Sequence, residues 1–163
     1  MADHQKPVPL PCGTKAPAFQ LESSTGDRIG LAEFAGEKTV VLYFYPKADT
    51  PGCTKQACGF RDAAAAYDKA KVAVLGISPD PVNKVKKFSD KFTLNFPLLA
   101  DPDHAVAERY GVWGEKRFMG RKYMGVLRTT FVIGTDGTVR HVFENVKPEG
   151  HDAAVLRWLD ENR

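Results

Sequence analysis

Cys53 is the residue of this sequence best placed for covalent chemistry. It follows an apolar run at residues 39–45 by a short loop of turn-forming residues, and it opens a helix expected over residues 53–69. A thiol attacks as its thiolate, and the unpaired N–H groups and positive dipole of a helix N-terminus stabilise that anion. The sequence therefore predicts a nucleophilic thiolate where a buried strand passes into a helix. The alternative is an inert cysteine that packs as a small hydrophobe.

Four further residues could complete a site around Cys53. Thr50 lies three positions before it, so its hydroxyl could turn toward the sulfur and both accept from and donate to an approaching substrate. Pro46, with Pro51, would stiffen the loop and shield the thiolate from water. Arg128, just before an expected strand, is the candidate for the cation that stabilises the thiolate and the negative charge on a departing oxygen.

Cys58 follows Cys53 with four residues between them. In an intact helix, positions i and i+5 lie about 8 to 9 Å apart between Cα atoms and point about 140° apart. A disulfide cannot span that separation. If the two cysteines pair, the first turns of the helix must unwind, and Gly52 and Gly59 are where unwinding is easiest. Cys58 could equally be structural.

The remaining cysteine and the histidines give no sign of a site. Cys12 stands in a segment rich in proline and glycine, and we expect it to be a bystander. Three cysteines are too few for a structural disulfide framework, so we expect thiols at rest. The histidines, from His4 to His151, have no metal-ligand spacing. We therefore expect no metal site.

Alternating strands and helices would position the cysteine loop. Strands are expected at residues 39–45, 72–78, 96–99, 129–133 and 139–146, and helices at 53–69, 81–92, 103–110 and 150–162, the second capped by Asp80. A strand, helix, strand order predicts parallel pairing with helices on the sheet faces. Turn residues at 134–137 and 24–27 indicate two hairpins. We predict one α/β domain over residues 1–163, with a central mixed β-sheet flanked by helices and an N-terminal β-hairpin extension.

The composition is close to that of ordinary soluble domains. Hydrophobic residues make up 43% and charged residues 26%, and the formal net charge is +3. Basic residues are scattered apart from a cluster at Lys116, Arg117, Arg121 and Lys122, so nucleic-acid binding is not indicated. The N-terminus has no apolar run of signal-peptide length, and no run of 18 apolar residues occurs. We expect a cytoplasmic protein that does not bind membranes.

The stretch from Phe44 to Asp62 closely resembles the active-site segment of peroxiredoxins, and more narrowly of the bacterioferritin comigratory protein, or peroxiredoxin Q, group. The family pattern of proline, three residues, threonine, two residues and cysteine is matched by Pro46, Thr50 and Cys53. Further similarity lies at residues 99–103, 110–114, 116, 119–120 and 128–133. The resemblance covers nearly all of the chain after the first dozen residues.

The resemblance implies a thioredoxin-like fold and reduction of hydrogen peroxide and organic hydroperoxides. It implies that Cys53 is the peroxidatic residue, that Cys58 is the resolving residue, and that Arg128 is the family's strand arginine. A transient Cys53–Cys58 disulfide would be reduced by thioredoxin or a similar dithiol protein. Members with this cysteine spacing are often monomers, so we expect a monomer.

Two other functions compete with this one. A dithiol oxidoreductase of the thioredoxin type would need Cys-x-x-Cys, whereas four residues separate Cys53 and Cys58 here. A redox-switched binding or chaperone module would form the disulfide without consuming peroxide catalytically. Turnover of peroxide with a thioredoxin system distinguishes these functions.

Overall fold

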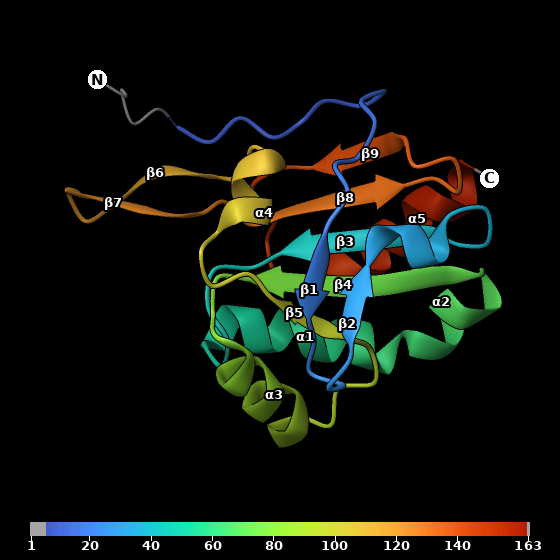
Figure 1. Ribbon diagram of the computed structural model, residues 1–163, viewed down its shortest axis with the longest axis horizontal. Helices are drawn as coiled ribbons and strands as arrows, with labels where there is room; N and C mark the ends of the chain where they lie inside the picture. Colours follow the sequence, from blue (N-terminus) through green and yellow to red (C-terminus); the bar gives the residue numbers. More distant parts are fainter. Residues whose placement is uncertain (1–5, 163) are drawn as a thin grey trace.

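The computed structural model describes residues 6–162, and His4 and the start of the N-terminal segment lie outside that range. Along the chain the elements are β1 (Gln20–Glu22), β2 (Arg28–Gly30), the 3-10 helix η1 (Leu31–Phe34), β3 (Thr39–Phe44), α1 (Pro51–Asp62), α2 (Ala64–Lys69), β4 (Val72–Ser78), α3 (Val82–Lys91), β5 (Leu98–Ala100), α4 (Ala105–Arg109), β6 (Trp113–Phe118), β7 (Arg121–Val126), β8 (Thr129–Ile133), β9 (Val139–Phe143) and α5 (His151–Glu161). Figure 1 shows their arrangement.

A five-stranded mixed sheet forms the centre of the fold, in the order β5-β4-β3-β8-β9. Strand β3 runs parallel to β4 and antiparallel to β8, and β4 runs parallel to β5. The predicted α/β fold with a central mixed sheet is confirmed. Because β3 and β4 are parallel, both end at the same edge of the sheet, which is where the Cys53 loop begins.

Each face of the sheet is covered by its own hydrophobic core. Along β3 the side chains alternate, so Val40, Leu42 and Phe44 enter one core while Val41 and Tyr43 enter the other. The first core is closed by α4 and the N-terminal segment, and the second by α1, α2, α3 and α5. Figure 1 shows β1 and β2 crossing one face while α5 lies behind the other. Burial on both faces explains why this strand is an uninterrupted apolar run.

Several local predictions are confirmed to within a few residues. β1 and β2 form the N-terminal antiparallel hairpin, and β8 and β9 form the predicted hairpin around residues 134–137. The last helix, α5, begins after Gly150, which adopts a left-handed conformation.

The helix that carries the cysteines differs from the prediction. It begins at Pro51, two residues earlier than expected, because the fixed φ of proline suits the first helical position. It also ends at Asp62, and Ala63 separates it from α2, so the single helix over residues 53–69 was wrong. The predicted cap of α3 by Asp80 was also wrong, because the N-cap is Pro81. The Asp80 carboxylate instead accepts hydrogen bonds from Ala48 and Ser78.

Strands β6 and β7 were absent from the prediction. They pair with each other in antiparallel register, from Trp113 opposite Val126 to Phe118 opposite Arg121. Their residues are mostly charged or exposed, so neither strand has the apolar face that marks a half-buried strand in a sequence.

Between residues 6 and 162, no helix is long and apolar enough to cross a membrane. Over the same range there is no cluster of three or more histidine, cysteine or acidic side chains that could hold a metal ion.

Candidate functional site

Cys53 lies in the first turn of α1, directly after the loop that leaves β3. Thr50 is the N-cap of this helix and Pro51 follows it. The Cys53 side chain is 1% exposed, so its sulfur is largely withdrawn from water. The first N–H groups of a helix have no partner within the helix, and their dipoles favour an anion near them. The helix start therefore favours negative charge at this position, and burial shields the sulfur from water.

Arg128 lies beside this sulfur. Its Nη2 donates a hydrogen bond to Cys53 Sγ at 3.3 Å, and its Nη1 donates to Gln56 Oε1 at 2.6 Å. Gln56 is itself 1% exposed. A guanidinium fixed in this way presents one N–H to the sulfur and needs little reorganisation when charge develops there. Arg128, the candidate cation of the sequence, thus lies within hydrogen-bonding distance of Cys53.

Gly52 lets the guanidinium come this close to the helix. A Cβ atom at this position would lie 3.3 Å from Arg128 Nη2 and 3.3 Å from the ring of Pro148. Both contacts are tighter than most side chains tolerate, so a larger residue would push the arginine or Pro148 away. Glycine therefore serves the packing of the site.

Thr50 has a different hydrogen bond from the one expected. Its hydroxyl donates to the carbonyl of Lys47 at 2.8 Å, so in this arrangement its proton is engaged and its oxygen is left as an acceptor. Pro46 is half-buried at the end of β3. Both residues belong to the loop beside Cys53, but no hydrogen bond from Thr50 to the sulfur occurs among the described residues.

Buried and surface contacts hold this loop in place. The N–H of Ala48 donates to Asp80 Oδ2 at 2.7 Å, and the Ser78 hydroxyl donates to the same oxygen at 2.9 Å. On the surface, Lys91 pairs with Asp49 at 2.9 Å. The loop is therefore tied to the end of β4 and to α3, which limits how far the residues around Cys53 can move.

Cys58 lies on the same helix as Cys53 but is less buried. It is partly exposed, and both it and Cys53 are free thiols in this structure. Because α1 is continuous from residue 51 to residue 62, the two cysteines have the separation of an intact helix. The structure thus holds the cysteines apart, and any bond between them requires that α1 opens.

Lys116 adds a second positive charge near the site. Its Nζ donates to the carbonyl of Val126 at 2.8 Å, two residues before Arg128. Burial lowers the pKa of Lys116 and the positive charge of Arg128 lowers it further, whereas the nearby Cys53 thiol acts in the opposite direction. The electrostatic field at the sulfur therefore includes this half-buried lysine.

Behind α1, a buried histidine joins the helix layer to the sheet. His151 Nε2 lies 2.8 Å from the hydroxyl of Thr130, and its ring packs edge-on against Phe60. Burial lowers the pKa of His151 to about 4, and the positive charge of Arg128 contributes to this shift. His151 is therefore neutral near pH 7.

Sequence reasoning missed Gln56 and Lys116 as members of the site. Gln56 carried a usable signal, because a residue three positions after Cys53 lies on the neighbouring turn of the same helix. Lys116 carried none by itself, since its approach to the site depends on the unpredicted hairpin of β6 and β7.

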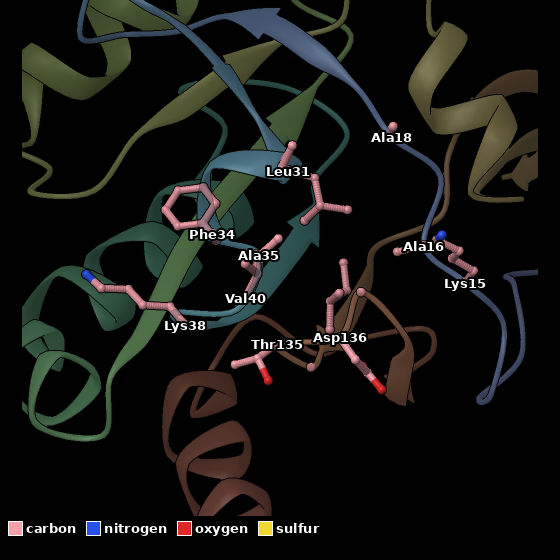
Figure 2. A pocket seen from close by; sticks show the side chains of 14 residues that line it. Lys15, Ala16, Ala18, Leu31, Phe34, Ala35, Lys38, Val40, Thr135 and Asp136 are labelled. Carbon is pink, nitrogen blue, oxygen red and sulfur yellow. The ribbon is translucent and has the colours of Figure 1, made fainter.

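A pocket lies away from Cys53 and Arg128. It has a volume of about 270 Å³ and is lined largely by alanine, leucine, phenylalanine and valine side chains (Figure 2). Val40 and Ile133, which pair across β3 and β8, place it at the opposite end of β3 from Cys53. No cysteine or histidine lines it, so the cavity is not a second reaction centre of this kind.

The mixed sheet with flanking helices, and a buried thiol beside an arginine at a helix start, define the class of thioredoxin-fold thiol enzymes. Comparison with known proteins makes this class specific. The model of the AhpC/TSA family matches residues 12–142. Peroxiredoxin Bcp of Escherichia coli K12 is 50% identical over 154 residues, covering 94% of this chain and 98% of that protein. The putative peroxiredoxin bcp of Coxiella burnetii is 49% identical over 147 residues, covering 90% of this chain and 97% of that protein.

Solved structures agree with these sequence relatives. Peroxiredoxin Q of Xanthomonas campestris superposes with a TM-score of 0.83 at 35% identity, covering 88% of this chain and 90% of that one. Peroxidoxin BcpB of Mycobacterium tuberculosis superposes with a TM-score of 0.82 at 38% identity, covering 93% and 97% of the two chains. The chain belongs to the AhpC/TSA family, within the peroxiredoxin Bcp and peroxiredoxin Q group. Its activity is the thiol-dependent reduction of peroxides.

Proposed function

We propose that Cys53 is the nucleophile of this peroxidase. Its thiolate attacks one oxygen of the hydroperoxide, the O–O bond breaks, and the other oxygen leaves as water or an alcohol after taking up a proton. The sulfur is thereby oxidised to a sulfenic acid. The observation that carries the proposal is the 3.3 Å hydrogen bond from Arg128 Nη2 to Cys53 Sγ at the start of α1.

Arg128, Thr50 and Pro46 prepare that attack. The Arg128 guanidinium stabilises the thiolate and then the negative charge on the departing oxygen, and Gln56 fixes its orientation. The Thr50 oxygen, whose proton is bonded to Lys47, accepts the O–H of the incoming hydroperoxide. Pro46 stiffens the loop and limits access of water to the sulfur.

Cys58 then acts as the resolving residue. Its thiolate attacks the Cys53 sulfur, the S–O bond of the sulfenic acid breaks, and water leaves as the disulfide forms. Since the intact helix keeps the two cysteines apart, α1 must unwind over its first turns in this step. This assigns an atypical two-cysteine cycle to a single chain, consistent with a monomeric enzyme.

Thioredoxin or a similar dithiol protein completes the cycle by reducing the disulfide. The substrates are hydrogen peroxide and organic hydroperoxides. A structure of the Xanthomonas campestris bacterioferritin comigratory protein is described in terms of alkyl peroxide reduction, which supports the organic substrates for this relative. No bound cofactor takes part in the proposed cycle, because the two sulfurs carry the electrons.

Mass spectrometry after a single turnover tests the cysteine assignments. The fully reduced protein is treated with one equivalent of hydrogen peroxide, alkylated and digested without reductant. We expect one linked peptide that contains a Cys53–Cys58 disulfide. The Cys12→Ser variant should give the same product, and Cys58→Ser should accumulate a sulfenic acid at residue 53. A disulfide that includes Cys12 would contradict the resolving role of Cys58.

A further inference from the structure

The tip of the hairpin formed by β6 and β7 is unusually apolar for a surface. We call residues 113–126 the basic hairpin. Between residues 6 and 162, the large hydrophobic side chains that stand exposed are Val8 and four members of this hairpin, Phe118, Met119, Tyr123 and Met124. Phe118 is 67% exposed and Met119 is 87% exposed. Apolar side chains gathered on one protruding element indicate a surface that contacts a partner.

The turn at this tip contains a methionine at a position where the backbone disfavours one. Met119 has a φ of 51° and Gly120 a φ of 78°, the pattern of a type I′ turn, in which asparagine followed by glycine is preferred. A methionine in the left-handed region costs conformational energy. Its side chain makes no compensating burial, since it is almost fully exposed. The exposed side chain of Met119 is therefore available for a contact outside the folded chain.

The charged side chains of the hairpin also indicate a contact outside the folded chain. Arg117 pairs directly opposite Lys122 across the two strands, an arrangement of like charges that destabilises a hairpin. Arg121 stands beside the tip, and residues 117–124 are all exposed. The hairpin thus combines an apolar tip with a positive collar, by which we mean Arg117, Arg121 and Lys122. A complementary partner carries acidic side chains around an apolar surface.

The hairpin is attached directly to the reaction centre. Leu127, immediately after β7, donates its N–H to the carbonyl of Val112, which closes the base of the hairpin one residue before Arg128. Lys116 lies inside this base and contacts Val126. Figure 1 shows β6 and β7 projecting from the end of the sheet at which β3 and β4 terminate. A macromolecule held by the hairpin is therefore close to the loop that carries Cys53.

We propose that the basic hairpin is the docking element for the dithiol protein that reduces the Cys53–Cys58 disulfide, and that this reductant presents acidic side chains around its exposed cysteine. The proposal rests on the proposed function. One reductant thiolate attacks a sulfur of the disulfide, which releases the other cysteine as a thiolate. The second reductant thiol then attacks the mixed disulfide, which leaves the reductant oxidised and both Cys53 and Cys58 reduced.

Two other occupants fit the observations less well. A second copy of this chain carries the same positive collar and a net charge of +3, so hairpins of two copies repel each other. A surface of anionic lipid would match the charge and the apolar tip, but it gives no reason for the hairpin to stand beside the thiol site. The dithiol reductant accounts for charge, apolar tip and location together.

Steady-state kinetics test this docking with a bacterial thioredoxin, thioredoxin reductase and NADPH as the probe. We expect Arg117→Glu/Arg121→Glu to lower kcat/KM for thioredoxin about 10-fold or more, and the wild-type value to fall as salt is added. Dithiothreitol, a small uncharged dithiol, should reduce the variant and the wild type equally. The rate of Cys53 oxidation by peroxide should also change less than about twofold.

Two matched variants separate docking from folding and from net charge. Met119→Asn places a favoured residue in the turn, so thermal stability should stay constant or rise while kcat/KM for thioredoxin falls. Lys69→Glu/Lys71→Glu makes the same change of charge just before the start of β4, whereas the hairpin lies near the end at which β4 terminates. This control variant should leave kcat/KM for thioredoxin unchanged. If Met119→Asn and the charge reversals in the hairpin leave kcat/KM for thioredoxin unchanged, the docking proposal is overturned.

Further outcomes distinguish the two proposals. A loss of dithiothreitol-supported turnover equal to the loss with thioredoxin would overturn docking, because the hairpin would then act on the site itself. Binding to phosphatidylglycerol vesicles that depends on Phe118 and Met119, with thioredoxin kinetics unaffected by these residues, would do the same. A wild-type protein that peroxide oxidises but thioredoxin does not reduce would overturn both the docking and the proposed recycling. Mass spectrometry would still detect the disulfide in that case.

Discussion

Where β3 and β4 end, polar side chains converge on one buried sulfur, whereas the opposite end of β3 borders a cavity of about 270 Å³ lined mostly by apolar side chains. The first region contains the Arg128, Gln56 and Cys53 hydrogen bonds and is closely packed. The second is more spacious, and its charged members, Lys15, Lys38 and Asp136, do not surround a nucleophile. Chemistry in this fold therefore follows the arrangement of donors and a helix start, and available volume is a poor guide to it.

The comparison also separates two kinds of stabilisation. At the cavity end, Val40 and Ile133 contribute burial of apolar surface, which stabilises the fold in proportion to area. At the thiol end, the structure keeps the Arg128 cation and the buried His151 close together, which costs stability. Substitutions at the thiol end should accordingly lower activity more than stability, and substitutions at the cavity end should lower stability more than activity.

The largest expected effect on activity comes from the sulfur itself. Cys53→Ser should lower peroxide turnover by about 10⁴-fold or more, because the hydroxyl is not ionised at neutral pH and cannot accept an oxygen atom in this way. Turnover is measured with thioredoxin as reductant, and Cys12→Ser serves as the control that removes an exposed thiol. Substantial activity in Cys53→Ser would refute the assignment of the nucleophile.

Arg128→Met should give the next largest effect. Removal of one positioned donor from a developing negative charge commonly costs about 10²- to 10³-fold in rate. We expect that loss in the second-order rate of Cys53 oxidation, followed by stopped-flow fluorescence, with the fold retained. Arg140→Met removes an arginine of β9 that does not contact the sulfur, and it should stay near the wild-type rate. Equal rates in the two variants would count against the role of Arg128.

The pH dependence of stability tests the buried histidine at the thiol end. The pKa of His151 is about 4 when folded and about 6.5 when unfolded, so the unfolded state binds more protons between these values. The free energy of unfolding should therefore fall as the pH drops from 7 to 5, by about 2 kcal/mol from this residue. Denaturant titrations of wild type and His151→Gln should show that the variant lacks this part of the loss. Identical pH profiles would mean that His151 does not contribute.

The smallest effect on activity is expected at the cavity end. Val40→Ala enlarges the cavity and removes buried methyl groups, so it should lower the free energy of unfolding by about 2 kcal/mol. The rate of peroxide reduction should nevertheless remain within about twofold of wild type at 25 °C, because Val40 lies at the opposite end of β3 from Cys53. A loss of rate as large as that of Arg128→Met would show that the two ends of the sheet are coupled.

Most of the central sheet could be predicted because β3, β4 and β8 are apolar runs buried on both faces. The site could be predicted in part, since Cys53 and Thr50 belong to one short motif and Arg128 matches a family position. Sequence could not reveal that the Thr50 proton binds Lys47, because that depends on the path of the loop. It also missed β6 and β7, whose polar residues hide their pairing.

The Arg128 guanidinium spans one helical turn, because it binds residue 53 and residue 56 together. On the proposed mechanism, the unwinding that brings Cys58 to the oxidised sulfur also pulls these two anchors apart. Once α1 has unwound, the site has consequently lost the geometry prepared for attack on peroxide. While α1 stays helical, the oxidised Cys53 can react with a second peroxide and form a sulfinic acid. On the proposed mechanism, the rate at which this turn opens, relative to the rate of that second oxidation, would set the peroxide concentration above which the enzyme inactivates itself.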